Sequence, residues 1–425
     1  MGNSSIPQLS YRAFGERLMA MASARRIPLF GEIELTYRCN QNCAHCYVNL
    51  PPGDREAKGR EMTAEEICRI IDEITDAGCL FLLLTGGEPM LRPDFLDIYA
   101  YAKKKGLLIT IFCTGTLVTP QIADYLAQWP PYNIEITIYG ATEQTYERVT
   151  GLPGSYRKCF AGIRLLLSRG LPVKLKTVVI SLNKHEFQQM EQIARDLGVE
   201  FKWDGHINAR IDGGRKPLDV RLDPEEVVAL DLATEKRITE WREFCDRLPR
   251  SYRTDRLYSC SAALTAFHID PYGRMTPCTM ARLHGYDLRQ GSFRDAWEGL
   301  FADLRKRRRP PTDRCADCDL MTICFQCTGW SQLEHGVEWA PVDFLCEVTH
   351  ARAEALGLPH ARGICCDVIE NIKTRKRRRL HGCAVGVHAA PARATGEISN
   401  EEKTLSQTGN PGSPISPSGI RHDGL

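Results

Sequence analysis

The chain has 425 residues, 43% of them hydrophobic and 25% charged, and its formal net charge is +2. These values are those of a globular protein and give no reason to expect binding to nucleic acid or to a membrane surface. No apolar run reaches the ~18 residues that span a bilayer, and the first residues lack the apolar core of a signal peptide. A chain of this length predicts more than one domain, together with terminal extensions.

Cysteine is the most informative residue type, with 18 copies. In a chain without a secretion signal, this number favours metal ligation in a reducing cytoplasm over a disulfide framework. We therefore expect a cytoplasmic protein that holds metal centres. Ten of the cysteines lie in two sets, which span residues 39–46 and 260–346.

The first elements surround the first of these sets. Residues 1–30 predict an N-terminal helical extension, and a strand follows at 31–37, directly before the cysteines. Thr63, with Glu66 three residues later, forms the capping-box signature of a helix start. A nearly continuous apolar run at 80–85 then predicts a second strand that is buried on both faces.

The same alternation of strand and helix continues to about residue 205. Four more strands are expected, at 107–112, 133–139, 173–180 and 199–203. Alternating elements give parallel strands joined by right-handed crossovers. Six such units over residues 31–205 predict an α/β fold, a partial TIM-like (β/α)6 barrel with its active site at the carboxyl ends of the strands. A doubly wound open sheet is the alternative.

Three segments follow the expected barrel. Residues 206–256 are polar and partly helical and predict a bridging segment, and residues 257–350 form a small cysteine-rich module. Residues 351–425 carry the basic run 373–379 and then become rich in Gly, Ser, Pro and Thr, which predicts a largely disordered basic tail. We interpret this run, and the basic run at 305–309, as solvated charge rather than as a nucleic-acid site.

The first cysteine set places Cys39, Cys43 and Cys46 at the spacing C-x3-C-x2-C directly after a strand. Three thiolates cannot close a four-coordinate site by themselves. An iron–sulfur cube held by three cysteines keeps one iron open, and that iron can chelate a small molecule. A structural zinc site would need a fourth ligand from elsewhere in the chain.

Together with Gly86-Gly87-Glu88-Pro89 after the second strand, this motif resembles the radical S-adenosylmethionine (SAM) superfamily. The resemblance implies that the three cysteines hold a [4Fe-4S] cluster whose open iron binds the amino and carboxylate groups of SAM. An electron from the cluster then cleaves SAM to a 5′-deoxyadenosyl radical, which abstracts hydrogen from a substrate.

The resemblance also implies contacts with SAM. The glycine pair would let the backbone approach the SAM amino group closely, as only glycine can, and Glu88 would place a carboxylate near that ammonium. Tyr47 would pack against the cluster or the adenine. Thr137 and Arg148 would contact the ribose and carboxylate of SAM, although an exposed helix arginine is the alternative for Arg148.

The second cysteine set consists of seven residues in the order Cys260, Cys278, Cys315, Cys318, Cys324, Cys327 and Cys346. With Gly273 between the first two, this order resembles the SPASM domain of radical SAM enzymes, which carries two auxiliary iron–sulfur clusters. The gap of two residues before Cys327 departs from the family, where three is usual. A module this small and rich in cysteine would need its metals to fold.

The resemblance implies a ligand set for each auxiliary cluster. One would be held by four cysteines, Cys315, Cys318, Cys324 and Cys346. The other would be held by Cys260, Cys278 and Cys327 and would be one thiolate short. Cys245 or another group would complete it, or an open iron would bind a substrate. A pair of zinc sites is the alternative for the whole module.

By this resemblance we expect a maturase that modifies a ribosomally made peptide or a protein. Sulfatase maturases carry an aspartate directly after the cysteine that Cys278 matches, and Thr279 stands here, which disfavours that activity. The expected partners are the substrate and an electron donor such as flavodoxin or ferredoxin. Because the extension before the barrel is too short for a recognition domain, a peptide would need a separate peptide-recognition protein or would dock directly. The alternatives are porphyrin or cofactor biosynthesis and a non-catalytic zinc or iron–sulfur module.

Overall fold

One mixed sheet organises the computed structural model, which describes residues 10–247, 254–311, 313, 315 and 318–358. Within these residues the strand order is β6-β5-β4-β3-β2-β1-β7-β8-β9. All neighbours from β6 to β7 are parallel, and β8 and β9 are antiparallel. The strands are β1 (Phe30–Glu34), β2 (Phe81–Thr85), β3 (Leu108–Cys113), β4 (Asn133–Thr137), β5 (Val173–Val178), β6 (Phe201–Asp204), β7 (Ala266–Ile269), β8 (Arg274–Thr276) and β9 (Tyr286–Asp287).

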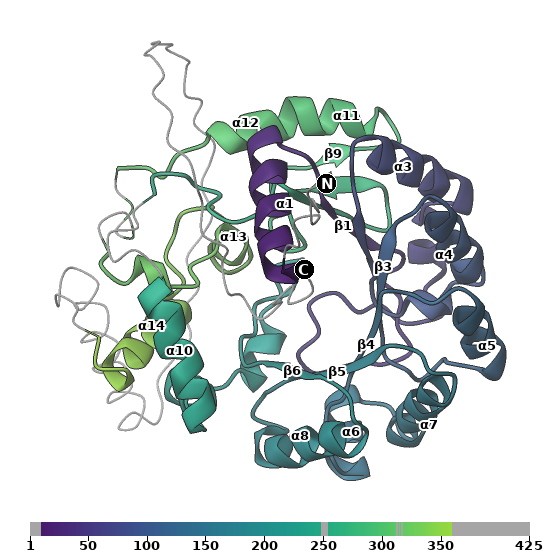
Figure 1. Ribbon diagram of the computed structural model, residues 1–425, viewed down its shortest axis with the longest axis horizontal. Helices are drawn as coiled ribbons and strands as arrows, with labels where there is room; N and C mark the ends of the chain where they lie inside the picture. Colours follow the sequence, from purple (N-terminus) through teal and green to yellow (C-terminus); the bar gives the residue numbers. More distant parts are fainter. Residues whose placement is uncertain (1–9, 248–253, 312, 314, 316–317, 359–425) are drawn as a thin grey trace, which may run out of the picture.

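Helices follow the first five strands and lie in an arc along the outside of the sheet (Figure 1). This arrangement confirms the predicted partial barrel. The strands follow one another without a reversal of order, whereas a doubly wound sheet reverses its order at a switch point. The helices are α3 (Ala64–Asp76), α4 (Phe95–Lys104), α5 (Pro120–Gln128), α6 (Glu143–Thr150), α7 (Ser155–Ser168) and α8 (Phe187–Asp196).

The remaining helices lie before the barrel, in its first loop and after β6. They are α1 (Tyr11–Arg25), α2 (Arg55–Arg60), α9 (Pro224–Asp231), α10 (Glu235–Arg247), α11 (Phe293–Asp295), α12 (Phe301–Lys306), α13 (Thr328–His335) and α14 (Asp343–Ala355). A π-helical turn, η4 (Ala296–Leu300), joins α11 to α12. The other short turns are 3-10 helices: η1 (Pro89–Leu91), η2 (Lys184–Glu186), η3 (Lys216–Val220) and η5 (Met321–Ile323). Among all the residues that the structure describes, no helix combines the length and apolar character needed to cross a membrane.

Helix α3 shows how the local sequence forms these elements. The predicted capping box is present, because the Thr63 hydroxyl accepts from the Glu66 amide and the Glu66 carboxylate accepts from the Thr63 amide. Four isoleucines at helical spacing are buried and pack against Ile33 of β1 in one core cluster: Ile67, Ile70, Ile71 and Ile74. Since side chains alternate along a strand, Glu32 and Glu34 of β1 face the opposite, inner side of the sheet.

The sheet continues beyond the six predicted strands. Strand β7, from the segment expected to form the cysteine-rich module, lies parallel to β1, with Phe30 opposite Ala266 and Glu32 opposite His268. This pairing places the cysteine-rich segment directly beside β1. The division into segments 1–30, 31–205, 206–256, 257–350 and 351–425 stays a proposal about folding units.

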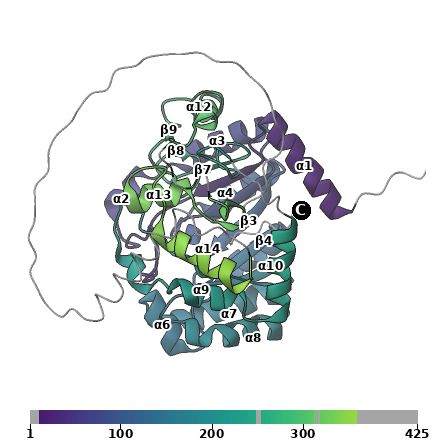
Figure 2. The same ribbon diagram turned by 90° about the vertical axis from the view of Figure 1, so that its left-hand side faces the viewer.

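Helix α14 closes the described part of the chain and packs against α9 (Figure 2). Arg352 is completely buried and makes an ion pair with Asp231 of α9, with its Nε 3.0 Å from Oδ2. Residues 351–355 therefore continue a helix. The remainder of the expected tail, with its basic run 373–379, lies outside the described residues.

The second basic run, Arg305–Arg309, is paired within the fold. Arg307 makes an ion pair with Glu338, Arg308 lies 3.0 Å from Asp255, and Arg309 lies 2.7 Å from Asp313. The guanidinium of Arg305 lies 5.0 Å from the ring centre of Trp297. Arg307 and Arg309 thus pair with buried carboxylates and are not the solvated charge that the sequence predicted.

Candidate functional site

The first three cysteines form one group in the loop after β1. Cys39 is buried, and burial raises its pKa to about 12. Burial also raises the pKa of Cys43, and the neighbouring thiols of Cys46 and Cys39 raise it further. Backbone amides already face two of the sulfurs: Gln41 N lies 3.4 Å from Cys39 Sγ, and Asn49 N lies 3.3 Å from Cys46 Sγ.

The loop is held to the barrel by backbone hydrogen bonds. The Asn42 amide donates to the Thr150 carbonyl at 2.8 Å, and the Ala44 amide donates to the Val149 carbonyl at 2.9 Å, at the end of α6. On the other side, the Cys39 amide donates to the Leu50 carbonyl at 2.9 Å. These contacts fix the path of the loop without using the thiols.

The cysteine loop carries polar atoms and thiols that are suited to contact a bound cluster. Buried Gln41 Nε2 and His45 Nδ1 have no hydrogen-bond partner among the residues that the structure describes. Such unpartnered buried atoms are rare in folded proteins, and three grouped thiols supply the donor set that iron–sulfur clusters take. Tyr139, which the sequence did not single out, hydrogen-bonds Cys43 and has its ring centre 5.2 Å from that of His45.

The glycine pair packs against the strand that leads into the cysteine loop. A Cβ on Gly87 would lie 2.4 Å from the Arg38 carbonyl oxygen, and one on Gly86 would lie 2.2 Å from that of Thr36. Gly86 also has a positive φ of 136°. The structure therefore gives these glycines a packing role, which the sequence analysis did not foresee. Their expected approach to SAM stays a prediction.

Glu88 is fully buried and connects the glycine turn to the end of β3. Its Oε2 accepts hydrogen bonds from the Thr114 amide at 2.7 Å and the Thr114 hydroxyl at 2.6 Å, and its Oε1 accepts from the Met90 amide at 3.0 Å. The Thr114 hydroxyl lies 2.7 Å from that of Thr116, which accepts from Asn40 in the cysteine loop. Thr114 and Thr116 thus belong to the site.

The structure separates the other expected SAM contacts. Tyr47 turns its hydroxyl to Glu34 at 2.8 Å. Thr137 is half-buried at the end of β4. Arg148 is exposed on α6 and donates to the Leu182 carbonyl at 2.6 Å, which is the alternative that we considered for it. A SAM contact of these three residues stays a prediction.

The second cysteine set divides into two neighbourhoods. The pKa of Cys278 is raised by burial and then by the thiols of Cys327 and Cys260, so these three sulfurs lie together. Burial likewise raises the pKa of Cys327 to about 11, with Cys260 as the next cause.

The second neighbourhood contains Cys324. Burial raises the pKa of Cys324. A hydrogen bond with Thr349 lowers that pKa, and the nearby thiol of Cys318 raises it. Thr349 lies one helical turn after Cys346 on α14, which places that cysteine on the same side. The Cys318 amide donates to the Cys315 carbonyl at 3.2 Å, so these two cysteines are neighbours. Cys245 packs beside Leu320 and Ile323 in a cluster that also includes Cys318, so it belongs to this neighbourhood rather than to that of Cys278.

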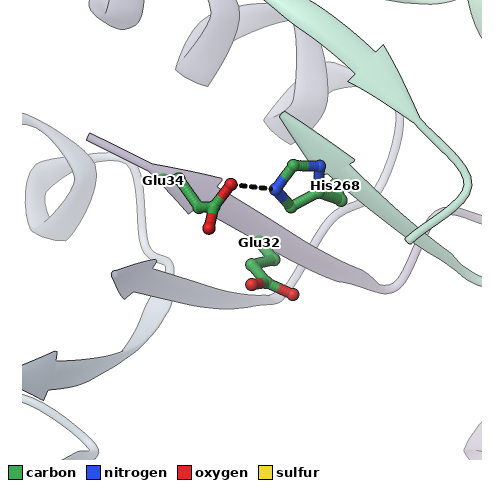
Figure 3. A group of neighbouring side chains, drawn as sticks. All are labelled: Glu32, Glu34 and His268. Carbon is green, nitrogen blue, oxygen red and sulfur yellow. Dashed lines mark hydrogen bonds and ion pairs between the residues drawn. The ribbon is translucent and has the colours of Figure 1, made fainter. Parts of the chain in front are cut away.

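A polar cluster on the inner face of β1 was missed by the sequence analysis (Figure 3). Glu34 Oε2 lies 2.8 Å from His268 Nε2 and 2.9 Å from a guanidinium nitrogen of Arg282. Burial alone would raise the pKa of Glu34, but His268 and Arg282 hold it at about 2. The two carboxylates could have been found from the sequence, because Glu32-Ile33-Glu34 places acids in alternation within an apolar strand. The pairing of this strand with β7 left no pattern in the sequence.

Glu32 points away from this ion pair. Its Oε2 accepts from the Thr279 hydroxyl at 2.8 Å, and burial raises its pKa. One potential ligand atom from each of Glu32, Glu34 and His268 lies within 4.8 Å of the others, so the three could surround a metal ion. The Arg282 cation beside Glu34 argues against that use, because a second cation would be repelled.

Lysines extend the charged inner face to the other strands. Lys176 of β5 and Lys202 of β6 lie 3.6 Å and 3.4 Å from the Glu135 carboxylate of β4. The Lys176 ammonium also lies 2.8 Å from the ring centre of Phe112. Burial lowers the pKa of Lys176 to about 8.

Comparison with known proteins supports this combination of fold and cysteines. The family model of the radical SAM superfamily matches residues 33–197, and that of the SPASM iron–sulfur cluster-binding domain matches residues 260–319. The AdoMet-dependent heme synthase of Methanosarcina barkeri is 25% identical over 73% of this chain and 93% of its own length. The antilisterial bacteriocin subtilosin biosynthesis protein AlbA of Bacillus subtilis is 27% identical over 70% of this chain and 65% of its own length.

Solved structures share the fold. Streptococcus suis SuiB bound to the precursor peptide SuiA aligns with a TM-score of 0.62 at 16% identity, over 81% of this chain and 83% of that chain. The first family model includes the whole first cysteine set, and the second includes Cys260, Cys278, Cys315 and Cys318 of the second set. The chain therefore belongs to the radical SAM superfamily and carries a SPASM domain, so it is an enzyme of a family that binds SAM and iron–sulfur clusters.

Proposed function

We propose that the enzyme cleaves SAM reductively and abstracts hydrogen from a peptide or protein substrate, as a maturase. The observation that carries this proposal is the group of Cys39, Cys43 and Cys46, whose loop lies at the carboxyl end of β1. When bound there, the [4Fe-4S] cluster and SAM supply the one-electron cleavage and the radical that takes the hydrogen atom.

The protein residues would position this chemistry. The three cysteines would hold the cluster and leave one iron for SAM. Gly86, Gly87 and Glu88 keep the neighbouring turn against the cysteine loop, and with Tyr47, Thr137 and Arg148 they are the proposed SAM contacts. Because Glu88 and Tyr47 also make hydrogen bonds with the protein itself, these two would hold the pocket in shape as well.

Two auxiliary clusters, both [4Fe-4S], are part of the proposal. One would be held by Cys315, Cys318, Cys324 and Cys346, and the other by Cys260, Cys278 and Cys327. The neighbourhood of Cys245 supports its exclusion from the second set. That cluster would therefore be completed by another group or keep an open iron.

A peptide substrate is supported by the relatives and by a carboxylate on the inner face. AlbA is named for bacteriocin biosynthesis, and SuiB is seen with a precursor peptide. The half-buried Glu32 carboxylate, supported by Thr279, would receive an N–H group of such a substrate. A separate recognition protein and a flavodoxin or ferredoxin as electron donor complete the proposal, and free thiols and clusters favour a cytoplasmic location.

Porphyrin or cofactor biosynthesis is the second candidate. It is favoured by the heme synthase relative, which this chain covers over 93% of that protein's length. The charged inner face, with Lys176 and Lys202, would suit the carboxylates of a porphyrin.

Anaerobic turnover distinguishes these candidates. The reconstituted enzyme, given dithionite and SAM, should release 5′-deoxyadenosine, and a Cys43→Ala variant should release none. Peptides encoded beside the gene and iron coproporphyrin are then added separately, and products are followed by mass spectrometry. A modified peptide supports the maturase, decarboxylated porphyrin supports the second candidate, and 5′-deoxyadenosine that is equal in parent and variant contradicts both.

A further inference from the structure

Glu34 lies at the centre of a buried network between the two cysteine-bearing segments. Its side chain is completely buried. Oε1 accepts from the hydroxyl of Tyr47, the residue after Cys46, at 2.8 Å. Oε2 lies 2.8 Å from Nε2 of His268 on β7, as Figure 3 shows, and 2.9 Å from Arg282. One carboxylate therefore contacts the segments of both cysteine sets.

Arg282 makes the same connection from the opposite side. Its Nε donates to the carbonyl of Thr279, the residue after Cys278, at 2.5 Å. Its NH1 donates at 2.7 Å to the hydroxyl of Tyr37, which lies two residues before Cys39. The guanidinium thus spans from one cysteine segment to the other, and its charge is matched by Glu34.

His268 continues the network to the backbone of Cys278. Its Nδ1 lies 2.9 Å from the Thr276 hydroxyl, and that hydroxyl donates to the Cys278 carbonyl at 3.1 Å. Since the hydroxyl hydrogen is already used, Nδ1 must donate to Thr276. Nε2 faces a carboxylate oxygen and must donate as well, so the geometry requires a hydrogen on both ring nitrogens.

The network consists of desolvated charges. Arg282 and His268 face the Glu34 carboxylate, and Arg282 also lies 3.8 Å from Asp270 Oδ2. Desolvated charges interact strongly over short distances, so removing one member changes the net charge beside both cysteine segments.

We infer that Glu34 and Arg282 are positioning residues that hold the loop of Cys39–Cys46 and the segment of Cys278 in one fixed arrangement and set the charge between their clusters. The inference requires that the clusters bind but is independent of the proposed peptide substrate. Cluster binding is checked first, by iron analysis and by the spectrum of the reconstituted enzyme, so a failure of the proposed function is recognised separately.

The test is an anaerobic redox titration followed by electron paramagnetic resonance, without substrate. Glu34→Gln removes a negative charge and should make both neighbouring clusters easier to reduce, so both reduction potentials should rise. Arg282→Gln removes a positive charge and should lower both. The double variant should return towards the parent. The auxiliary signal is assigned in a Cys43→Ala background, and Glu298→Gln, an exposed carboxylate, is the surface control and should change neither potential.

A second variant decides the outcome if a charge variant fails to bind iron. Tyr47→Phe removes one hydroxyl and no charge, and should alter the signal of the Cys39–Cys46 cluster while the auxiliary signal stays as in the parent. The inference is overturned if Glu34→Gln and Arg282→Gln load iron and leave both potentials unchanged, if they shift them in the same direction, or if Tyr47→Phe leaves the first cluster unaltered.

Discussion

Two carboxylates on the inner face of β1, Glu34 and Glu32, have different surroundings. Glu34 is fully buried and paired with cations, whereas Glu32 is only half-buried, and its one side-chain hydrogen bond among the described residues is from Thr279. The first carboxylate is therefore fixed within the protein, and the second is free to meet a substrate. The residue after Cys278 is Thr279, which has no carboxylate of its own. The carboxylate beside it is that of Glu32, from β1 of the barrel.

Glu32→Gln tests the substrate-facing role. The substitution keeps the size of the side chain and its contact with Thr279 but removes the charge. We expect product formation to fall by about tenfold or more, as for loss of a charged or acid–base contact, while 5′-deoxyadenosine release without substrate stays within about twofold. Liquid chromatography with mass spectrometry measures both. Unchanged product formation would contradict the role, and Glu32→Asp should restore part of it.

Gly87→Ala tests the packing of the glycine turn. The added methyl would meet the Arg38 and Tyr37 carbonyl oxygens at 2.4 and 2.6 Å, and backbone atoms cannot move aside as a flexible side chain can. We expect a loss of about 4 kcal/mol or more in unfolding free energy and reduced cluster loading. Gly53→Ala, where nothing lies within 4 Å, is the control and should stay within about 0.5 kcal/mol of the parent. Equal stabilities, from denaturant unfolding, would contradict this account.

Lys176 predicts a pH dependence of stability. Burial lowers its pKa from 10.5 to about 8, so the folded state releases this proton at lower pH than the unfolded state. Between pH 8 and 10.5 the unfolded state binds more protons, and stability from this residue rises with pH, by about 1–3 kcal/mol. Lys176→Met should remove that rise. Urea midpoints of parent and variant at pH 7.5 and 9.5 measure it, and parallel pH dependences would show that the lysine is not responsible.

At the scale of elements, the first six strands could be predicted because local signals mark them. Apolar runs, the capping box at Thr63 and the turns after each strand are features of neighbouring residues. Strand β7 could not be assigned to the same sheet, since its pairing with β1 joins residues far apart in sequence and leaves no local pattern. The expected ends of β1 and β4 were too late, because residues 35–37 and 138–139 already turn into the site loops.

Helix α14 is the element whose anchoring matters most for the second cysteine set. Arg352→Met should break the pair with Asp231 and leave a buried carboxylate without its cation, at a cost of about 3–5 kcal/mol. Because Cys346 lies on this helix, we expect the loss of one auxiliary cluster, seen as lower iron content, while the signal of the first cluster remains. The double variant Asp231→Leu with Arg352→Met should be less destabilised than the single one. Full iron content in Arg352→Met would contradict this role of the helix.

For the molecule as a whole, the fold and the family were predictable from the sequence, and the contacts within the site were not. The cysteine spacings and the glycine turn identified the family because they are contiguous motifs. The hydrogen-bond partners of Tyr47 and Glu88 depend on which side chains meet across the barrel, and the sequence does not show this. In the structure both residues are bonded to other protein groups. The same limit hid Glu34, His268 and Arg282. Membership of the radical SAM superfamily sets aside a non-catalytic zinc or iron–sulfur module.

Removing the metals should affect the two halves differently. The barrel and strand β7 share one apolar core that includes Ile33, Leu84 and Phe267, whereas the loop that carries Cys318, Cys324 and Cys327 would depend on its clusters to stay folded. Hydrogen exchange of the anaerobically chelated protein should therefore show lost protection over residues 318–327 and retained protection in β2–β5. Slow exchange throughout would show that the segment folds without metal.

The parallel pairing of β7 with β1 also has a practical consequence. A truncated chain that stops at residue 255 would keep all six barrel strands, yet it would expose the backbone donors and acceptors of β1 along an open sheet edge. Such edges recruit strands from other molecules and lead to aggregation. The barrel should therefore express in insoluble form when separated from the residues that follow it, even though its own cysteines are intact.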